Sequence, residues 1–233
     1  MTAFIELPIF HLTLTFLVYV AAVAVYARVR FFLLHPVLVT MVLVIVVLRI
    51  LGVEYETYER GGRYITFFLG PSVVALGVPL YREFRALRDS APAILVSVLL
   101  GSAVGIVSAV VPLIVAGAPY EVIVSLAPKS VTTPIAIGIV EGLGGNVSLA
   151  ASVVVITGVL GAVVGPPILR LLRVGEAVAF GLAIGASSHG IGTARALEDG
   201  PRQGAAASLA ICLNGIMTAI LTPPLVRLLI SVM

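Results

Sequence analysis

Long apolar runs separated by short polar gaps make up most of the chain. A helix needs roughly 20 apolar residues to cross the hydrocarbon core of a bilayer. Runs of about this length cover residues 9–27, 31–51, 91–116, 147–169 and 203–231. The third of them carries a face of small residues, typical of close helix packing, at Gly101, Ser102, Gly105 and Ser108. The pattern predicts membrane-spanning helices.

Further apolar segments contain proline or glycine where a straight helix would need neither. They cover residues 64–81, 121–141 and 176–200. Proline removes a backbone donor and clashes with the preceding turn, and glycine lets the backbone leave helical geometry. The residues expected to break these helices are Pro71, Pro128, Pro134, Gly190 and Gly192. We therefore expect an all-α integral membrane protein with about 7–8 hydrophobic segments, some of them broken or re-entrant.

Composition assigns the chain to a membrane rather than to solution. Its 233 residues are 60% hydrophobic and 11% charged, whereas a soluble domain has roughly 25% charged residues. The net charge is only +3 and the arginines cluster in short gaps, which indicates an oriented membrane protein rather than one that binds nucleic acid. One cysteine excludes an internal disulfide and a cysteine metal site. No sequence motif of an enzyme, a metal site or a cofactor site is found.

Basic residues predict which loops face the cytoplasm. The turn with Arg28 and Arg30 and the arginine-rich loop at 82–89 are expected there. Between them, residues 53–63 hold glutamates, tyrosines and a glycine pair. That composition is interpreted as an extracytoplasmic loop with aromatic interface anchors.

The segment at 121–141 allows two topologies. If it crosses the membrane completely, Arg170 and Arg173 come to lie outside, against the positive-inside rule. If it dips in and returns, both arginines become cytoplasmic. The sequence leaves both arrangements open.

The only lysine of the chain, Lys129, lies inside this second broken segment between Pro128 and Pro134. An ionisable group at membrane depth marks a candidate functional site. A lysine there can hold an anion, and a half-helix that begins near Pro134 would add its positive dipole end. A small carboxylate fits this arrangement. The alternative is a lysine at the end of a segment that reaches the lipid headgroups.

Other polar residues of the irregular segments complete the candidate substrate-binding set, namely Ser130, Thr132, Thr133, Ser188, His189 and Asn214. The hydroxyls near the prolines either contact substrate or satisfy carbonyls that the breaks leave free. The histidine either donates to a carboxylate and relays a proton, or caps a broken helix. The asparagine either binds substrate or only ties helices together.

An internal repeat is suggested at an offset of 57 residues, which pairs Leu69 with Leu126, Pro71 with Pro128, Val98 with Val155 and Gly101 with Gly158. Transporters often combine repeats with discontinuous helices. We expect a single polytopic domain over residues 1–233, with 1–62 as scaffold helices and 63–233 as a broken-helix transport core. The first two helices would offer an interface for a homodimer.

Several motifs resemble those of the LrgB/CidB family, and the resemblance covers about the whole chain. They are LGPSVVALGVPLY at 69–81, LAPKSVTTPIAIGI at 126–139, GAVVGPPIL at 161–169, ASSHGIGTARA at 186–196 and LNGIMTAILTPPL at 213–225. The resemblance implies a multi-pass protein of the bacterial inner membrane.

The function that the resemblance implies is divided. Bacterial members are holin/antiholin-like modulators of murein hydrolase activity and autolysis, with a smaller LrgA/CidA-type membrane partner. A related plastid protein exchanges glycolate and glycerate, and some bacterial relatives are associated with pyruvate uptake. The sequence therefore predicts a secondary transporter of small monocarboxylates without cofactor, metal or enzymatic chemistry. The alternative is a regulator of autolysis that forms or restrains a membrane lesion.

Overall fold

The computed structural model describes residues 5–29, 31, 34, 36–68 and 90–232, together with residues 71, 74, 75, 78, 81, 82 and 88. Its helices are α2 (Pro8–Val29), α3 (Pro36–Leu51), α4 (Tyr55–Phe67), α7 (Ala91–Val115), α8 (Tyr120–Leu126), α9 (Thr133–Leu143), α10 (Val147–Leu171), α11 (Ala177–Asp199) and α12 (Pro201–Val232). No strand occurs within these residues. The prediction of an all-α fold is confirmed. By length and apolar composition, α2, α7, α10, α11 and α12 are candidate membrane spans, but α11 leaves helical geometry at His189 and so does not form one straight span.

The chain divides into two compact units, residues 1–75 and residues 76–233. In the first unit, α2 packs against both α3 and α4. Residues 55–63 of the predicted extracytoplasmic loop are helical, because α4 runs through them, and their place outside the cytoplasm stays a prediction. The glycine pair that suggested a loop serves helix packing instead: a Cβ on Gly61 would lie 2.9 Å from the Cβ of His11 on α2.

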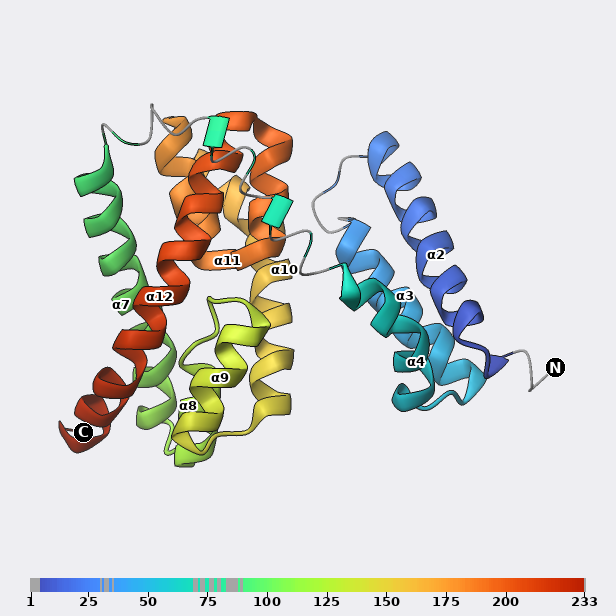
Figure 1. The fold of residues 1–233 in the computed structure, drawn as a ribbon, viewed down its shortest axis with the longest axis horizontal. Coiled ribbons are helices and arrows are strands. Elements are labelled where there is room, and N and C mark those ends of the chain that lie inside the picture. The colour runs from blue at the N-terminus through green and yellow to red at the C-terminus, as the bar shows by residue number, and fades with distance from the viewer. Residues whose placement is uncertain are drawn as a thin grey trace. The chain divides into compact units, whose positions relative to one another are not determined.

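In the second unit, α8 and α9 form the first hairpin, and its tip is residues 127–132. Figure 1 shows both helices at the same end of the unit, with the connecting loop reaching toward its middle. The backbone amide of Asn146 after α9 donates to the hydroxyl of Ser125 in the last turn of α8 at 2.7 Å, which holds the chain after α9 against α8. This is the chain path that the re-entrant topology predicts.

The second hairpin is α11 itself, which turns back on itself at His189. That residue has φ 41° and ψ −136°, far from helical values. The two halves lie antiparallel, because Gly192 packs against Ile184 and Gly204 at the start of α12 packs against Leu197. The first half also packs against α12, where Gly181 meets the backbone of Gln203. We define the tip of this second hairpin as residues 186–189.

The two hairpins belong to similar stretches of chain. The long helices α7 and α10 begin 56 residues apart, and the hairpins at α8 and α11 begin 57 residues apart. In Figure 1, α7 runs toward the end where the first hairpin starts, and α10 runs back toward the end where the second starts. The hairpins therefore enter the unit from opposite ends. At Pro71, the neighbouring residues lie outside the described part, so the break expected there stays a prediction.

Both ends of this unit carry charges of both signs. Arg170 lies in the last turn of α10, and Arg202 in the first turn of α12 lies at the same end as Glu176, the N-cap of α11. At the opposite end lie Glu121 in the first turn of α8 and Glu141 in the last turn of α9, together with Arg227 near the end of α12. The orientation expected from the positive-inside rule therefore stays a prediction.

Candidate functional site

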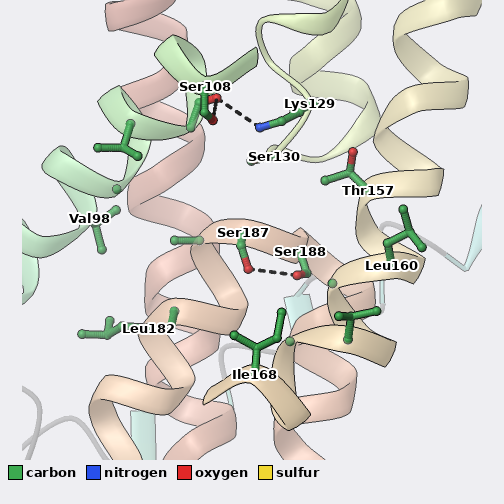
Figure 2. Close-up of a pocket in the computed structure, with 18 of the residues that line it drawn as sticks. Val98, Ser108, Lys129, Ser130, Thr157, Leu160, Ile168, Leu182, Ser187 and Ser188 are labelled. Carbon is green, nitrogen blue, oxygen red and sulfur yellow. Dashed lines mark hydrogen bonds between the residues drawn. The ribbon is translucent and has the colours of Figure 1, made fainter. Parts of the chain in front are cut away.

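A pocket of about 810 Å³ lies in the second unit between α7, α10 and α11, and the tip of the first hairpin closes one end of it. Figure 2 shows Lys129 and Ser130 at that end, Val98 and Ser108 on α7, and Thr157 and Leu160 on α10. Small residues, Gly101, Gly105, Gly161 and Gly165, open the space between the helices. The walls are mostly apolar, so the hydroxyl and ammonium groups dominate the electrostatics of the site.

Lys129 reaches the pocket because the chain between α8 and α9 is not helical. The flanking prolines cause this local structure: Pro134 lies in the first turn of α9, where its missing N–H group needs no partner. The Nζ of Lys129 donates a 3.1 Å hydrogen bond to the carbonyl of Gly105 on α7 (Figure 2). Its side chain is thereby held across the pocket mouth rather than directed outward.

No carboxylate neutralises this lysine in the described part of the chain, where the ion pairs formed are those of Arg195 with Glu198 and Asp199. A lysine ammonium has three hydrogens to donate, and the Gly105 carbonyl accepts one of them. A buried or half-buried cation without a counter-ion is costly. The arrangement can therefore attract and hold an anion.

Serines at the tip of the second hairpin face the same space. Ser187 and Ser188 both line the pocket, and their hydroxyls lie 3.0 Å apart (Figure 2). Close packing brings Ser188 there, because a Cβ on Gly161 of α10 would collide with its hydroxyl. Together with Ser130, whose hydroxyl lies near Gly105 of α7, these groups give an anion several hydrogen-bond donors.

The pocket brings together only part of the residues expected from the sequence. Lys129, Ser130 and Ser188 line it, whereas Thr132, Thr133, His189 and Asn214 do not. Thr132 precedes α9 as its N-cap and makes no side-chain capping hydrogen bond. A ligand role for these residues stays a prediction.

His189 holds the second hairpin to α10. Its Nε2 lies 2.8 Å from the carbonyl of Val154, and since a carbonyl only accepts, Nε2 carries the hydrogen. The ring packs where Gly158 leaves room for it. Thr193 donates to the His189 carbonyl at 2.8 Å. The side chain is buried in these contacts, and its Nε2 bonds to α10 rather than capping the break in α11. A role of His189 in substrate binding or proton relay stays a prediction.

Sequence reasoning missed Thr157, Ser97 and Ser187, which contribute hydroxyls to the pocket wall. The signal in the sequence that could have identified them is a hydroxyl residue in the middle of an apolar run, as at Thr157. The small-residue face of α7 was expected to serve helix packing, and Gly101 and Gly105 line the pocket instead. Among the described residues, no three His, Cys, Asp or Glu side chains gather as metal ligands.

Comparison with known proteins gives a family match over nearly the whole chain. The LrgB-like family matches residues 15–228. "Uncharacterized protein YxaC" of Bacillus subtilis (strain 168) is 36% identical over 222 residues, which are 95% of this chain and 96% of the relative. "Holin-like protein CidB" of Staphylococcus aureus (strain N315) is 34% identical over 195 residues, 84% of this chain and 85% of the relative. No solved structure matches.

Proposed function

We propose that this chain, which belongs to the LrgB-like family, is a secondary transporter that carries a small monocarboxylate across the bacterial inner membrane. One observation carries the proposal. Lys129 lines the pocket, its ammonium group donates to the Gly105 carbonyl, and no carboxylate lies within ion-pair distance of it in the described part of the chain. A carboxylate of the pyruvate, glycolate or glycerate class would supply the missing charge.

The pocket chemistry supports a small acid with hydroxyl or keto groups. Lys129 would bind the carboxylate through a charge-assisted hydrogen bond, which is stronger than a neutral one. Ser130, Ser187 and Ser188 line the same pocket and would bond the remaining oxygens. The α9 helix begins at Thr133, so its positive dipole end lies at the same tip as Lys129.

The arrangement of the hairpins supports transport rather than static binding. Discontinuous helices that meet at mid-depth from opposite ends are typical of secondary transporters, in which one repeat moves against another. In the second unit, both hairpin tips contribute to one pocket. A movement of both tips together, as one body, would expose that pocket first to one end and then to the other.

The test is uptake of radiolabelled pyruvate or glycolate into proteoliposomes. We expect Lys129→Gln to lower uptake about ten- to hundredfold, because it removes a charge-assisted hydrogen bond. The matched control is Arg170→Gln, which removes an exposed cation at the end of α10 outside the pocket. Saturable uptake that survives Lys129→Gln unchanged would contradict the proposal.

A second candidate function is holin-like modulation of murein hydrolase activity and autolysis. The name of the Staphylococcus aureus relative favours it, and the comparisons support it better than they support transport, since neither relative is named as a transporter. A smaller LrgA/CidA-type membrane protein would be its partner, and a homodimer is a further proposal. In the same proteoliposomes, leakage of unrelated solutes at the same rate in wild type and in Lys129→Gln would favour this function.

A further inference from the structure

Asn214 lies on α12 at the level where both hairpin tips end. Its side chain is 2% exposed, and it makes contacts with three other parts of the second unit. The carbonyl oxygen Oδ1 accepts hydrogen bonds from Ser102 of α7 at 2.7 Å and from Thr218 at 3.3 Å. The amide nitrogen Nδ2 donates to the carbonyl of Ser130 and to the carbonyl of Ala186, each at 3.0 Å.

The orientation of this amide follows from its partners. The Ser130 and Ala186 carbonyls can only accept, so the group that faces them must be the NH₂ and not the oxygen. Both hydrogens of Nδ2 are then used, one for each hairpin tip. A flipped amide would place Oδ1 against two carbonyl oxygens and leave all three without a donor.

Both carbonyls lie beside places where the chain leaves helical geometry. Ser130 lies in the non-helical tip of the first hairpin, and Ala186 comes shortly before the point where α11 loses helical geometry at His189. Carbonyls next to such breaks cannot all be paired within a helix. At membrane depth no bulk water replaces the missing donors. Asn214 supplies one hydrogen to each tip.

The two contacts occupy nearly equivalent places in the repeated stretches of chain. Ser130 and Ser187 are separated by the 57 residues that separate the starts of the two hairpins, and Ala186 precedes Ser187 directly. One side chain on α12 therefore bonds the two tips at corresponding positions. A residue that only filled space between helices would not need this pairing.

A direct role for Asn214 in binding substrate conflicts with this geometry. The side chain does not line the pocket, and its two N–H groups and its oxygen all have partners. An anion could bond to Nδ2 only by displacing the carbonyl of one tip. Ser130 does line the pocket, so Asn214 acts on the site through it and through the adjoining second tip.

We propose that Asn214 is a positioning residue that ties the tips of the two hairpins together and so fixes the distance between Lys129 on one tip and Ser187 and Ser188 on the other. The tie itself is independent of the identity of the ligand. Its consequence for anion affinity rests on the proposed transport function.

The test compares Asn214→Leu with Ser102→Ala in the full-length protein in lipid nanodiscs. Asn214→Leu removes both donations to the tips. Ser102→Ala removes one neighbour of Oδ1 at the same buried spot and keeps both donations, so it controls for a general packing defect. Hydrogen exchange at residues 127–132 and 186–189 is measured by mass spectrometry without any added anion.

We expect Asn214→Leu to accelerate exchange about tenfold at both tips together, and Ser102→Ala to change either tip less than about twofold. Faster hydrogen exchange at one tip only, at neither tip, or equally in both variants would contradict the proposal that Asn214 joins the tips. If Asn214→Leu does not fold, Asn214→Asp takes its place, because it keeps the oxygen toward Ser102 and removes the NH₂ group. The same hydrogen-exchange results at the two tips then support or overturn the proposal.

Pyruvate binding supplies the functional readout. In Asn214→Leu we expect the dissociation constant to rise about tenfold although the residue does not line the pocket, with Ser102→Ala staying within about twofold. An unchanged dissociation constant in Asn214→Leu would overturn the positioning role. If the wild-type protein binds no pyruvate, the transport function fails, and hydrogen exchange alone still decides whether Asn214 joins the tips.

Discussion

The two hairpins of the second unit reach the same pocket with different local chemistry. The first leaves helical geometry over residues 127–132, with prolines at both sides, and carries Lys129 at its tip. The second turns within α11 at the single residue His189, which is buried. One hairpin presents a charge to the pocket, and the other buries its ionisable residue and presents serines.

The difference shows that a break in a helix can serve binding or packing. Prolines stop the first helix through covalent geometry, so the break itself is set locally, although Ala127 and Val131 of the tip are buried in the core. The second turn puts a non-glycine residue at φ 41°, a costly conformation that persists only when surrounding contacts fix it. Gly158 and Gly161 of α10 provide those contacts by admitting His189 and Ser188.

The largest effect on stability is expected at Gly158 of α10, which leaves room for the tip of the second hairpin. Gly158→Ala places a Cβ against the His189 ring and should lower the free energy of unfolding by about 1–3 kcal/mol through overpacking. Thermal unfolding in detergent, followed by circular dichroism, measures it. The matched control is Gly138→Ala on α9, where a Cβ meets nothing within 4 Å and should stabilise the helix by about 0.5–1 kcal/mol. Equal effects would contradict the contrast between the hairpins.

An intermediate effect is expected from His189→Leu. The variant loses the hydrogen bond to the Val154 carbonyl, which is worth about 1 kcal/mol of stability. Because the ring does not line the pocket, the KM for pyruvate uptake should stay within about twofold of wild type, unlike that of Lys129→Gln. If His189→Leu raised KM as much as Lys129→Gln, the histidine would bind substrate rather than only hold the second hairpin to α10.

The smallest effect concerns the starts of the hairpin helices outside the membrane. Burial raises the pKa of the Glu176 carboxyl, but amide hydrogen bonds from Ala179 and Val178 and the nearby charge of Arg202 outweigh it and hold the pKa below its ordinary value. The Ala179 amide donates to Oε2 at 2.6 Å. A lowered folded-state pKa gives stability that is present above the unfolded-state pKa and is lost as pH falls through the folded-state value.

Glu176→Gln should remove this pH dependence and cost less than about 1 kcal/mol at pH 7, since the side chain is exposed and solvent screens it. Unfolding measured from about pH 7 to about pH 3 checks the difference between wild type and variant. Thr132→Ala is the comparison in the first hairpin, because Thr132 makes no side-chain capping bond and its loss should leave the pH profile unchanged. A variant that follows the wild-type profile would show that Glu176 does not contribute.

The sequence by itself determined the fold class, the long helices and the position of the first break. Those features depend on local properties: an apolar run of sufficient length forms a helix in a membrane, and proline interrupts it wherever it stands. The place of Lys129 between Pro128 and Pro134 is of this kind. The small residues of α7 and the glycines around His189 were also visible, but their purpose was not.

Only the tertiary structure decided which partners those residues meet. It made residues 55–63 part of α4, where Gly61 packs on α2, turned His189 toward Val154, and placed Asn214 between Ser130 and Ala186, residues 84 and 28 positions away. Hydrophobicity is almost uniform around each long helix, so its pattern cannot specify which helix faces meet. Close approach at glycines and the need to pair buried polar groups specify them, and both depend on residues far apart in the sequence.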